Sequence, residues 1–364
     1  MCSMADTVAT NGSIFERHRY ISLASLMLAV TLITLTALEY GFRIGRDIVR
    51  GSAWISRAEN VDDDELGWVL NPQKKLVNKT NACGENVVRR PPISPYLLKL
   101  HTGQLRPGLP VLFLGDSITQ GTETSSDGLY YEVFEKGGGG RFAVSASGGG
   151  GFGTAQEFLL LQKVYPLVKP AIVFWQLSTN DAGENVFTGT DISTVQKPRP
   201  YYDPGSDSFT TRNPALWLLQ HSELSKYMYG ELMKIERSRP FGLSQLTSWL
   251  LPGQNLDPAE VTRRGLGVME RLLAKARKAY PDTWFIGFNA FETFDDEYRT
   301  VFERQGAAYI PSLAKAMQSS GAGRRLDCAP VDAHWNHEGN RVAAALLLGF
   351  VDRALLTHPG LVPH

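Results

Sequence analysis

From residue 109 onward, short apolar segments alternate with amphipathic segments, and this alternation constrains the fold more than any other sequence feature. Turn-forming residues bound the apolar segments, which is typical of buried strands. The predicted strands are 110–115, 142–146, 171–177, 284–288 and 307–310. Strands that alternate with helices favour a parallel sheet covered on both faces. We therefore predict an α/β fold with the sheet as its middle layer.

Capping residues and the helical spacing of apolar residues predict the helices between these strands. The predicted helices are 127–136 capped by Asp127, 154–168 capped by Thr154, 260–280, 295–305 and a last helix that Asn336 opens. The stretch 183–257 breaks the alternation with several prolines and holds helical pieces around 222–235. We interpret it as an insertion at the carboxyl edge of the sheet, where substrate-shaping segments lie in open α/β folds.

An apolar run without charged residues, Ile21 to Leu38, precedes this domain. As a helix the run would span about 27 Å, close to the hydrocarbon thickness of a bilayer. Tyr40 suits the membrane interface. The sequence thus predicts an uncleaved transmembrane helix at 21–42 after a tail at 1–20. The alternatives are a cleaved signal peptide, although no small-x-small cleavage pattern follows, and a buried core helix.

The orientation of this helix is open to two interpretations. Two arginines precede the apolar run and four follow it: Arg17 and Arg19, then Arg43, Arg46, Arg50 and Arg57. The positive-inside rule, counted literally, places the carboxyl side in the cytoplasm. Long domains translocate largely regardless of charge, and a single amino-terminal anchor usually serves to export one. We predict a single-pass protein whose catalytic domain is extracytoplasmic, hence periplasmic in a Gram-negative bacterium.

The residues between the helix and the domain, 43–107, are mixed in character and rich in turn signals. They predict an extended juxtamembrane segment that lies on the main domain, which spans 108–357. In an oxidising compartment Cys83 and Cys328 could pair, while Cys2 would remain in the cytoplasm. The alternative is three unrelated thiols.

Composition excludes several classes of function. Lys plus Arg and Asp plus Glu both number 37, so the net charge is zero and gives no reason to expect a nucleic-acid partner. Three cysteines are too few for a disulfide scaffold and too scattered for a structural zinc site. The sequence also lacks the H-E-x-x-H pattern of zinc peptidases.

Four polar segments carry the candidate chemistry, and three of them directly follow predicted strands. Ser117, in Gly-Asp-Ser-Ile-Thr, would present its hydroxyl and backbone N–H at the mouth of the sheet. Asn180, in Ser-Thr-Asn-Asp, could donate its amide to a carbonyl oxygen. Taken singly, each segment also has a structural interpretation: Ser117 could be a helix-capping serine, and Asn180 could belong to an ordinary Asn-Asp turn.

The second polar segment is the glycine-rich stretch 147–153. Its glycines would let backbone N–H groups approach a ligand closely. Gly148, Gly150 and Gly153 also fit the G-x-G-x-x-G pattern of a dinucleotide site. That alternative requires an acidic residue about twenty positions later at a strand end, and none occurs before Asp181.

The fourth segment is Asp332-Ala-His334-Trp-Asn. A carboxylate two residues before a histidine can fix its tautomer and stabilise the imidazolium, as in a base that activates serine. A surface turn is the alternative interpretation of this segment. His337 is a nearby alternative base that falls inside the last predicted helix.

Together these segments resemble the SGNH hydrolase superfamily, the GDSL esterases and lipases, over about residues 109–355. The resemblance implies a flavodoxin-like α/β/α sandwich. It implies Ser117 as nucleophile, His334 as base and Asp332 as its partner. The oxyanion hole would comprise the N–H of Ser117, the N–H of Gly151 and the side chain of Asn180.

Three positions depart from the family pattern. Ala146 stands where asparagine is usual, Ser178 stands where glycine is common, and the last block is D-x-H rather than D-x-x-H. The Trp and Asn after the histidine resemble membrane-associated members that handle acylated polysaccharides.

The implied activity is serine-esterase hydrolysis of acyl or acetyl esters, which needs no metal and no cofactor. Two other functions remain open. One is an O-acyltransferase or deacetylase acting on a cell-envelope polysaccharide, and the other is a non-catalytic envelope-binding module with the same fold. The expected partners are a small-molecule or glycan ester and the membrane.

Overall fold

A five-stranded parallel sheet forms the centre of the molecule in the computed structural model, which describes residues 18–49, 59–101, 108–186, 199–210, 222–238, 256–321 and 323–357. Its strands are β5 (Leu109–Gly115), β6 (Phe142–Gly148), β7 (Ile172–Leu177), β10 (Trp284–Asn289) and β11 (Ala308–Ile310). Their spatial order is β11-β10-β7-β5-β6. This is the flavodoxin-like order of doubly wound folds. The predicted fold class is therefore confirmed, and each predicted strand overlaps an observed one.

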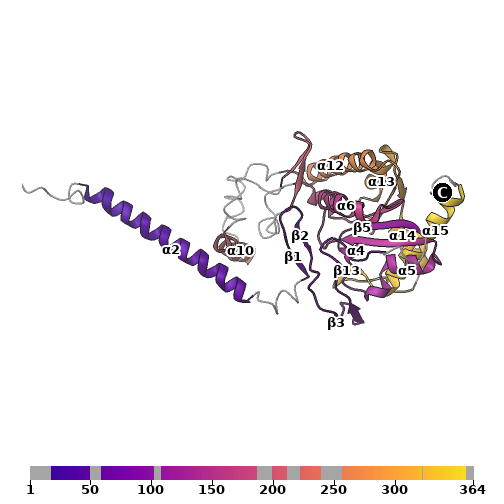
Figure 1. The fold of residues 1–364 in the computed structure, drawn as a ribbon, viewed down its shortest axis with the longest axis horizontal. Helices are drawn as coiled ribbons and strands as arrows, with labels where there is room; N and C mark the ends of the chain where they lie inside the picture. Colours follow the sequence, from indigo (N-terminus) through magenta and orange to yellow (C-terminus); the bar gives the residue numbers. More distant parts are fainter. Residues whose placement is uncertain are drawn as a thin grey trace, which may run out of the picture.

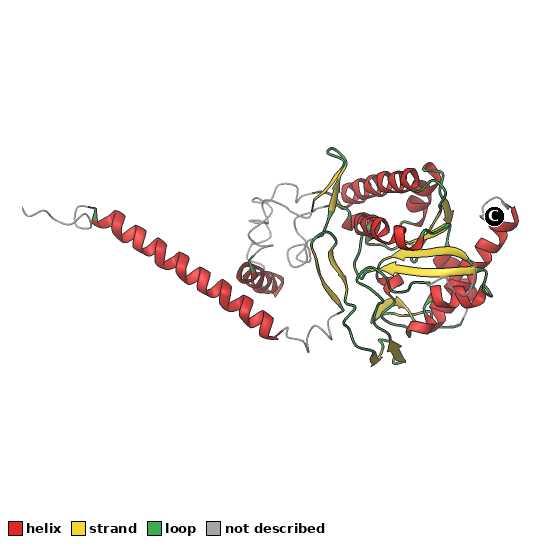
Figure 2. Ribbon diagram, in the orientation of Figure 1, coloured by secondary structure: helices red, strands yellow, loops and turns green. Residues whose placement is uncertain are grey.

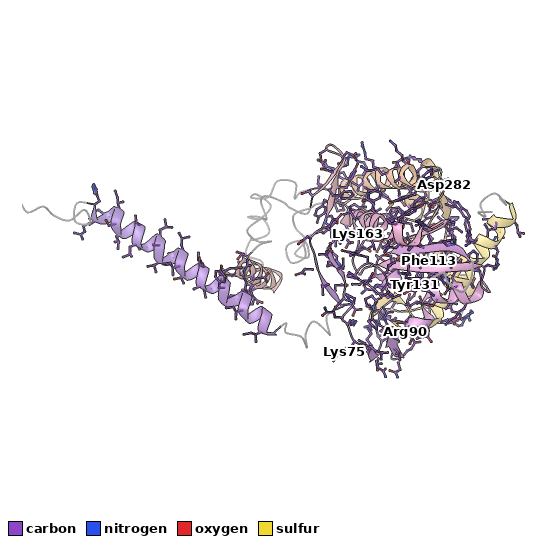
Figure 3. The ribbon with its side chains drawn as sticks, in the orientation of Figure 1. Lys75, Arg90, Phe113, Tyr131, Lys163 and Asp282 are labelled. Carbon is purple, nitrogen blue, oxygen red and sulfur yellow. A yellow bond between two sulfur atoms is a disulfide. The ribbon has the colours of Figure 1, made fainter. Side chains whose placement is uncertain are left out.

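Helices cover both faces of the sheet (Figures 1 and 2). One face carries α6 (Thr154–Val168), α12 (Pro258–Ala279) and α13 (Asp295–Arg304). The other carries α5 (Tyr130–Gly137), α14 (Leu313–Ser320) and α15 (His337–Thr357). Alternate side chains of a strand point to opposite faces, so β5 contributes Leu112 and Leu114 to the first core and Val111 and Phe113 to the second. Figure 3 shows Phe113 in the middle of the domain.

Two predicted helix starts need correction. Asp127 lies in a single 3₁₀ turn, η1 (Ser126–Gly128), and α5 begins only at Tyr130. The Tyr130 N–H donates instead to Asn340 Oδ1 (2.9 Å), a tertiary cap from a distant part of the chain. α6 does begin at Thr154, but its capping residue is Gly153. Asn336 acts as predicted, since its Oδ1 accepts from Gly339 N at the start of α15 (2.9 Å).

The apolar run near the amino terminus forms one long helix, α2 (Arg19–Val49). Its segment Arg19–Gly45 is long and apolar enough to cross a membrane by length and composition. None of that segment is buried against the described chain (0%), which argues against the core-helix alternative. The helix also continues beyond residue 42, so 43–49 are helical rather than extended as predicted. Within the helix the backbone N–H and C=O groups hydrogen-bond to one another, as a membrane-spanning segment requires.

The juxtamembrane segment forms two antiparallel hairpins on the domain. Their strands are β1 (Asn60–Asp63), β2 (Gly67–Leu70), β3 (Val77–Thr80) and β4 (Asn86–Arg89). Leu66, Trp68 and Val69 are buried in the core beside α6. These hairpins are thus part of the packed domain.

The remaining elements are short or belong to the insertion. The short ones are α4 (Ser117–Gln120), α7 (Asp181–Glu184), β12 (Asp327–Cys328) and β13 (Asp332–Trp335). The insertion contributes the hairpin β8 (Tyr201–Asp203) and β9 (Ser208–Thr210), and the helix α10 (Glu223–Ser238). The rest of the predicted insertion, 187–198, 211–221 and 239–255, lies outside the described residues.

Candidate active site

Ser117 is the first residue of α4, which begins directly after β5. The carboxylate of Asp116 caps this helix by accepting from Ile118 N (2.9 Å). Ser117 is itself half-buried, whereas the residues on either side of it are buried. Between Asp116 and Ile118, the serine is therefore accessible to a ligand while its two neighbours are not, which is what a nucleophile would require.

Gln176 on β7 fixes the position of this turn. Its Oε1 accepts from Asp116 N (3.1 Å), Thr119 N (3.3 Å) and Thr119 Oγ1 (2.9 Å). Its Nε2 donates to Ser178 Oγ (3.0 Å), which gives a contact for the serine that stands where the family commonly has glycine. One amide on the central strand thus connects the segments that carry Ser117 and Asn180.

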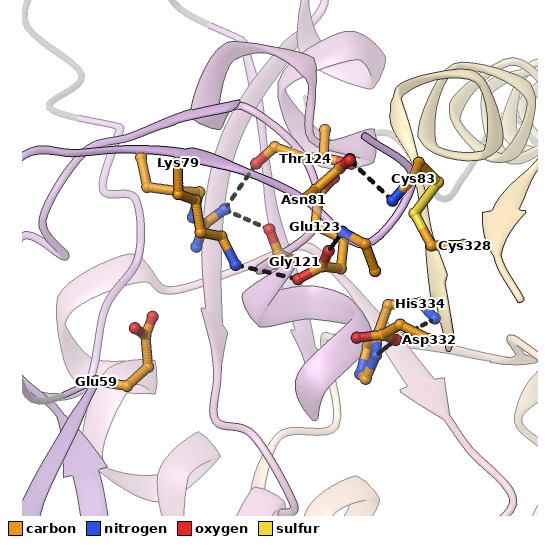
Figure 4. A network of polar contacts seen from close by, with 12 residues as sticks. Glu59, Lys79, Asn81, Cys83, Gly121, Glu123, Thr124, Cys328, Asp332 and His334 are labelled. Carbon is orange, nitrogen blue, oxygen red and sulfur yellow. Dashed lines mark hydrogen bonds and ion pairs between the residues drawn. A yellow bond between two sulfur atoms is a disulfide. The ribbon is translucent and has the colours of Figure 1, made fainter. Parts of the chain in front are cut away.

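The juxtamembrane hairpin β3–β4 holds the loop that follows α4 (Figure 4). Lys79 Nζ donates to Glu123 Oε1 (3.1 Å), and Asn81 Nδ2 donates to the Glu123 carbonyl (2.8 Å). The buried guanidinium of Arg89 donates to the carbonyls of Gly121 (2.5 Å) and Gln120 (2.6 Å) at the end of α4. Buried backbone carbonyls without partners are costly, so Arg89 stabilises the end of the helix that carries Ser117.

Asp332 and His334 lie together on β13. Asp332 Oδ1 accepts from His334 N (2.9 Å) and also from the ring Nδ1 of the same histidine. Partial burial opposes ionisation of Asp332, but these hydrogen bonds hold the pKa of its carboxyl below the ordinary value. A proton on Nδ1 leaves Nε2 unprotonated in the neutral ring and able to accept a proton.

Packing of α4 against β13 brings the serine and the histidine to the same edge of the sheet. The Thr124 hydroxyl, just after α4, donates to the Trp335 carbonyl at the end of β13 (3.0 Å). His334 is also close enough to Asp116 to act electrostatically on its carboxyl. Among the described residues, no hydrogen bond joins Ser117 Oγ to the His334 ring. Such contacts are often long in free enzymes and shorten when substrate binds.

A disulfide joins Cys83, in the turn of the β3–β4 hairpin, to Cys328 on β12. Their Cα atoms are 4.9 Å apart across 245 residues of chain. β12 pairs with β13, so the bridge fastens the hairpin beside Asp332 and His334 (Figure 4). The pairing that the sequence left open is therefore present in the structure.

Loss of this bridge is expected to destabilise the folded chain by about 3–5 kcal/mol, because it closes a long loop in the unfolded state. The change is the double variant Cys83→Ser with Cys328→Ser, measured by denaturant unfolding of the full chain in detergent. Cys2→Ser is the matched control and should leave the free energy of unfolding unchanged. Equal stability of the double variant and the native chain would contradict the prediction.

Gly151 lies in the middle of the turn between β6 and α6, with φ +72°, a backbone conformation that favours glycine. A Cβ built on its neighbour Gly150 would lie 4.0 Å from Ser117 Cβ, so this turn borders the serine. Gly150 N already donates to Gln120 Oε1 (2.5 Å). No partner for Gly151 N is seen in the described part of the chain, which leaves this N–H able to bind an oxyanion.

Two side chains that sequence analysis did not single out hold the turn at Gly150 and Gly151. Trp68 Nε1 donates to the Gly150 carbonyl (3.0 Å) and Arg199 Nη2 donates to the Gly151 carbonyl (3.0 Å). The Arg199 guanidinium also lies 5.3 Å from the centre of the Trp68 ring, within cation–π range. The apolar Trp-Val-Leu run of β2 is a sequence signal for a buried tryptophan, but no pattern indicates the role of Arg199.

Asn180 lies just before α7 and is already hydrogen-bonded in this structure. Its Nδ2 donates to Glu184 Oε2 (2.7 Å) and more weakly to the Phe152 carbonyl (3.4 Å). Glu184 in turn pairs with Arg199 (2.9 Å). An oxyanion could replace the long contact to Phe152 while Glu184 continues to orient the amide.

His337, the other candidate base, lies at the start of α15. Its Nδ1 is 3.7 Å from Glu85, on the β3–β4 hairpin, and its side chain is 40% exposed. Within the described ranges, no carboxylate hydrogen-bonds to the His337 ring as Asp332 does to the His334 ring. The geometry thus favours His334 over His337 as the base.

Three carboxyl groups are fully buried behind the site, on Asp116, Glu157 and Asp181. Glu157 accepts from Trp175 Nε1 (2.7 Å), and Asp181 accepts from Ser178 N (2.5 Å). Burial raises the pKa of each carboxyl, and it does so strongly for Glu157 and Asp181. Repulsion from Asp116 adds to the effect at both, and repulsion from Glu157 adds to it at Asp181. Burial thus disfavours the ionised form of these carboxyl groups in the folded protein.

The buried Glu157 is expected to make the native chain less stable as the pH rises. In the unfolded chain a glutamate loses its proton above about pH 4.3, whereas the raised pKa keeps it protonated in the folded chain. Folding then takes up a proton, so the stability falls from about pH 5 upward until the folded pKa is passed. Glu157→Gln should remove this loss, which amounts to about 1.4 kcal/mol for each pH unit between the unfolded and the folded pKa.

Thermal unfolding at a series of pH values measures this effect. The matched control is Glu303→Gln on the exposed side of α13, which should leave the pH dependence unchanged. Parallel pH profiles for native chain and Glu157→Gln would show that the carboxyl is ionised in the folded state, contrary to the prediction.

Comparisons with known proteins find distant structural likenesses. No protein-family model matches the sequence, and no curated protein matches it. Similar solved structures include the psychrotrophic esterase EstA from Pseudoalteromonas sp., a protein described as a GDSL-like lipase from Parabacteroides merdae and the acetyl xylan esterase Est2A from Butyrivibrio proteoclasticus. The three are thus described as two esterases and one GDSL-like lipase.

The sequence identities to these three proteins are 9%, 12% and 11%, and the TM-scores are 0.38, 0.37 and 0.36. The matches cover 67%, 68% and 77% of this chain and 97%, 96% and 68% of the other chains. Likenesses this distant assign no activity, so the function depends on the geometry of the site itself.

Proposed function

We propose that this protein is a serine esterase that hydrolyses carboxylic esters, with Ser117 as nucleophile, His334 as base and Asp332 as the residue that orients it. The observation that carries the proposal is the Asp332–His334 pair on β13, packed against the helix that begins with Ser117. A tautomer fixed through Nδ1 directs the basic nitrogen away from the carboxylate, as activation of a serine requires.

The mechanism has two acyl-transfer steps. Ser117 Oγ attacks the ester carbonyl and forms a C–O bond, while His334 Nε2 takes the hydroxyl proton. The N–H groups of Ser117 and Gly151 and the amide of Asn180 stabilise the oxyanion. The intermediate then expels the alcohol, which receives the proton from His334. Water, activated by the same imidazole, hydrolyses the acyl-enzyme and regenerates Ser117.

We also propose that α2 anchors the enzyme to a membrane and that the catalytic domain is extracytoplasmic. The Cys83–Cys328 disulfide supports this location, because disulfides persist in oxidising compartments and are rare in the cytosol. The domain division proposed from the sequence assigns 108–357 to the hydrolase domain. The β1–β2 hairpin shares the core of this domain, and the β3–β4 hairpin is joined to it by the disulfide, so both belong to the same folded unit.

The experiment that tests the function is turnover of a series of nitrophenyl esters by the full chain in detergent. The expected result is ester hydrolysis without any added acceptor, together with covalent labelling by a fluorophosphonate probe. Turnover that occurs only when an envelope glycan is added would show a transferase instead. A folded protein with no labelling and no turnover would contradict catalysis and favour a binding module.

A further inference from the structure

A helix of the insertion, α10, is attached to the end of the apolar part of α2. The Glu39 carboxylate, one residue after the charge-free run, accepts from Ser222 Oγ (2.8 Å) and from the N–H groups of Glu223 (3.0 Å) and Leu224 (3.0 Å). Glu39 thus caps α10 from another helix, since an anion at a helix N-terminus satisfies unpaired N–H groups. Phe42 and Tyr227 add a ring contact at 5.1 Å.

This attachment fixes the height of α10 relative to a membrane that α2 would cross. The run from Ile21 to Leu38 matches the hydrocarbon thickness, so Glu39 would lie at its boundary with the headgroups. Figure 1 draws α2 along its length but α10 nearly end-on beside it, so the two helices cross steeply. With α2 near the membrane normal, α10 lies close to the plane of the membrane.

One face of α10 is apolar and largely exposed, apart from the contact of Tyr227 with Phe42 of α2. Tyr227 and Met228 are 54% and 53% exposed, and Leu232 and Ile235 are also among the exposed large apolar side chains. With Leu224, these residues recur at the spacing that places side chains on one side of a helix. One charged residue, Glu231, falls within this face and is half-buried.

We propose that α10 is an interfacial helix whose apolar face enters the lipid surface at the end of the α2 span. This inference rests on the proposed anchoring by α2 and adds a second attachment of the domain to the membrane. An amphipathic helix in this position buries its apolar face about 5–10 Å into the boundary between headgroups and acyl chains. The helix has equal numbers of acidic and basic residues, so the attraction is apolar and does not require anionic lipid.

The test uses the full chain with Cys2→Ser, reconstituted in phosphatidylcholine vesicles, with an environment-sensitive fluorophore at a single introduced cysteine. The variant Met228→Cys reports on α10 and Leu32→Cys on the middle of α2. Asp282→Cys is the control on the exposed surface of the domain, far from α2 in Figure 3. Nitroxide groups placed on the lipids near the headgroup or deep in the acyl chains quench nearby fluorophores.

The expected result is strong quenching of the Met228 label by the shallow nitroxide, strong quenching of the Leu32 label by the deep one, and little quenching at Asp282. Addition of phosphatidylglycerol should leave the Met228 signal unchanged. Quenching at Leu32 combined with an unquenched Met228 label would overturn the interfacial helix and leave the anchor intact. A blue-shifted but unquenched Met228 label would show a protein partner on this face, which also overturns it. No quenching at Leu32 would overturn the anchor and this inference together.

Discussion

Replacement of Ser117 by alanine is expected to lower kcat for ester hydrolysis by about a million-fold, because a triad that acts as a unit loses nearly all its benefit when the nucleophile is removed. The protein should still fold, since no hydrogen bond of the Ser117 hydroxyl is seen in the described chain and the cap from Asp116 remains. Hydrolysis of nitrophenyl acetate and labelling by a fluorophosphonate probe measure the effect. Both should disappear together.

Ser126→Ala is the matched control for this prediction. Ser126 lies in the turn after α4, where its hydroxyl accepts from Arg90 N (2.8 Å). Loss of one exposed hydrogen bond should leave kcat within a few-fold of the native value. If Ser117→Ala retains substantial turnover while the probe no longer labels it, the hydrolysis does not proceed through this serine and the proposed mechanism is wrong.

Replacement of Asp332 by asparagine is expected to lower kcat by about ten thousand-fold with little change in KM. The amide keeps the shape of the carboxylate but removes the charge that stabilises the imidazolium. It can also present an N–H to Nδ1, which would favour the tautomer with its proton on Nε2, where His334 must accept one. Steady-state kinetics separate the two parameters.

Asp327→Asn provides the control on the paired strand β12. Asp327 Oδ1 accepts from Ala329 N (3.0 Å), so it has a comparable backbone contact without a histidine partner. Native kinetics in Asp327→Asn and a loss of less than ten-fold in Asp332→Asn would together show that the carboxylate does not support the base. The role of Asp332 would then have to be abandoned.

The layered fold was predictable because its signal is local. Each central strand is a short apolar run between turn residues, and the order of strands follows from few topological choices. Helix boundaries were less predictable where the cap comes from elsewhere in the chain. The start of α5 at Tyr130 depends on Asn340, which no local pattern near Asp127 can reveal.

Within the candidate site, local contacts could likewise be predicted from the sequence and long-range contacts could not. Asp332 and His334 are two residues apart, so their contact could be expected from spacing alone. Trp68 precedes the glycine turn in the sequence and Arg199 follows it, and only folding brings both side chains to that turn. The hydrogen bond of Asn180 to the Phe152 carbonyl was likewise not predictable, because it depends on how α7 packs against the turn before α6.

The hairpins that precede the sheet limit where the proposed esterase domain could be cleaved from α2. Trp68 holds the glycine turn, Cys83 is bonded to β12 and Arg89 holds the end of α4, so each stabilises a different part of the candidate site. All three residues come before residue 93. Shedding by a protease that cleaved in 50–58 would release a domain with every wall intact. Cleavage after Arg89 would leave the hairpins joined covalently to the sheet only through the Cys83–Cys328 disulfide, so a released form that keeps all three contacts in one continuous chain begins upstream of residue 59.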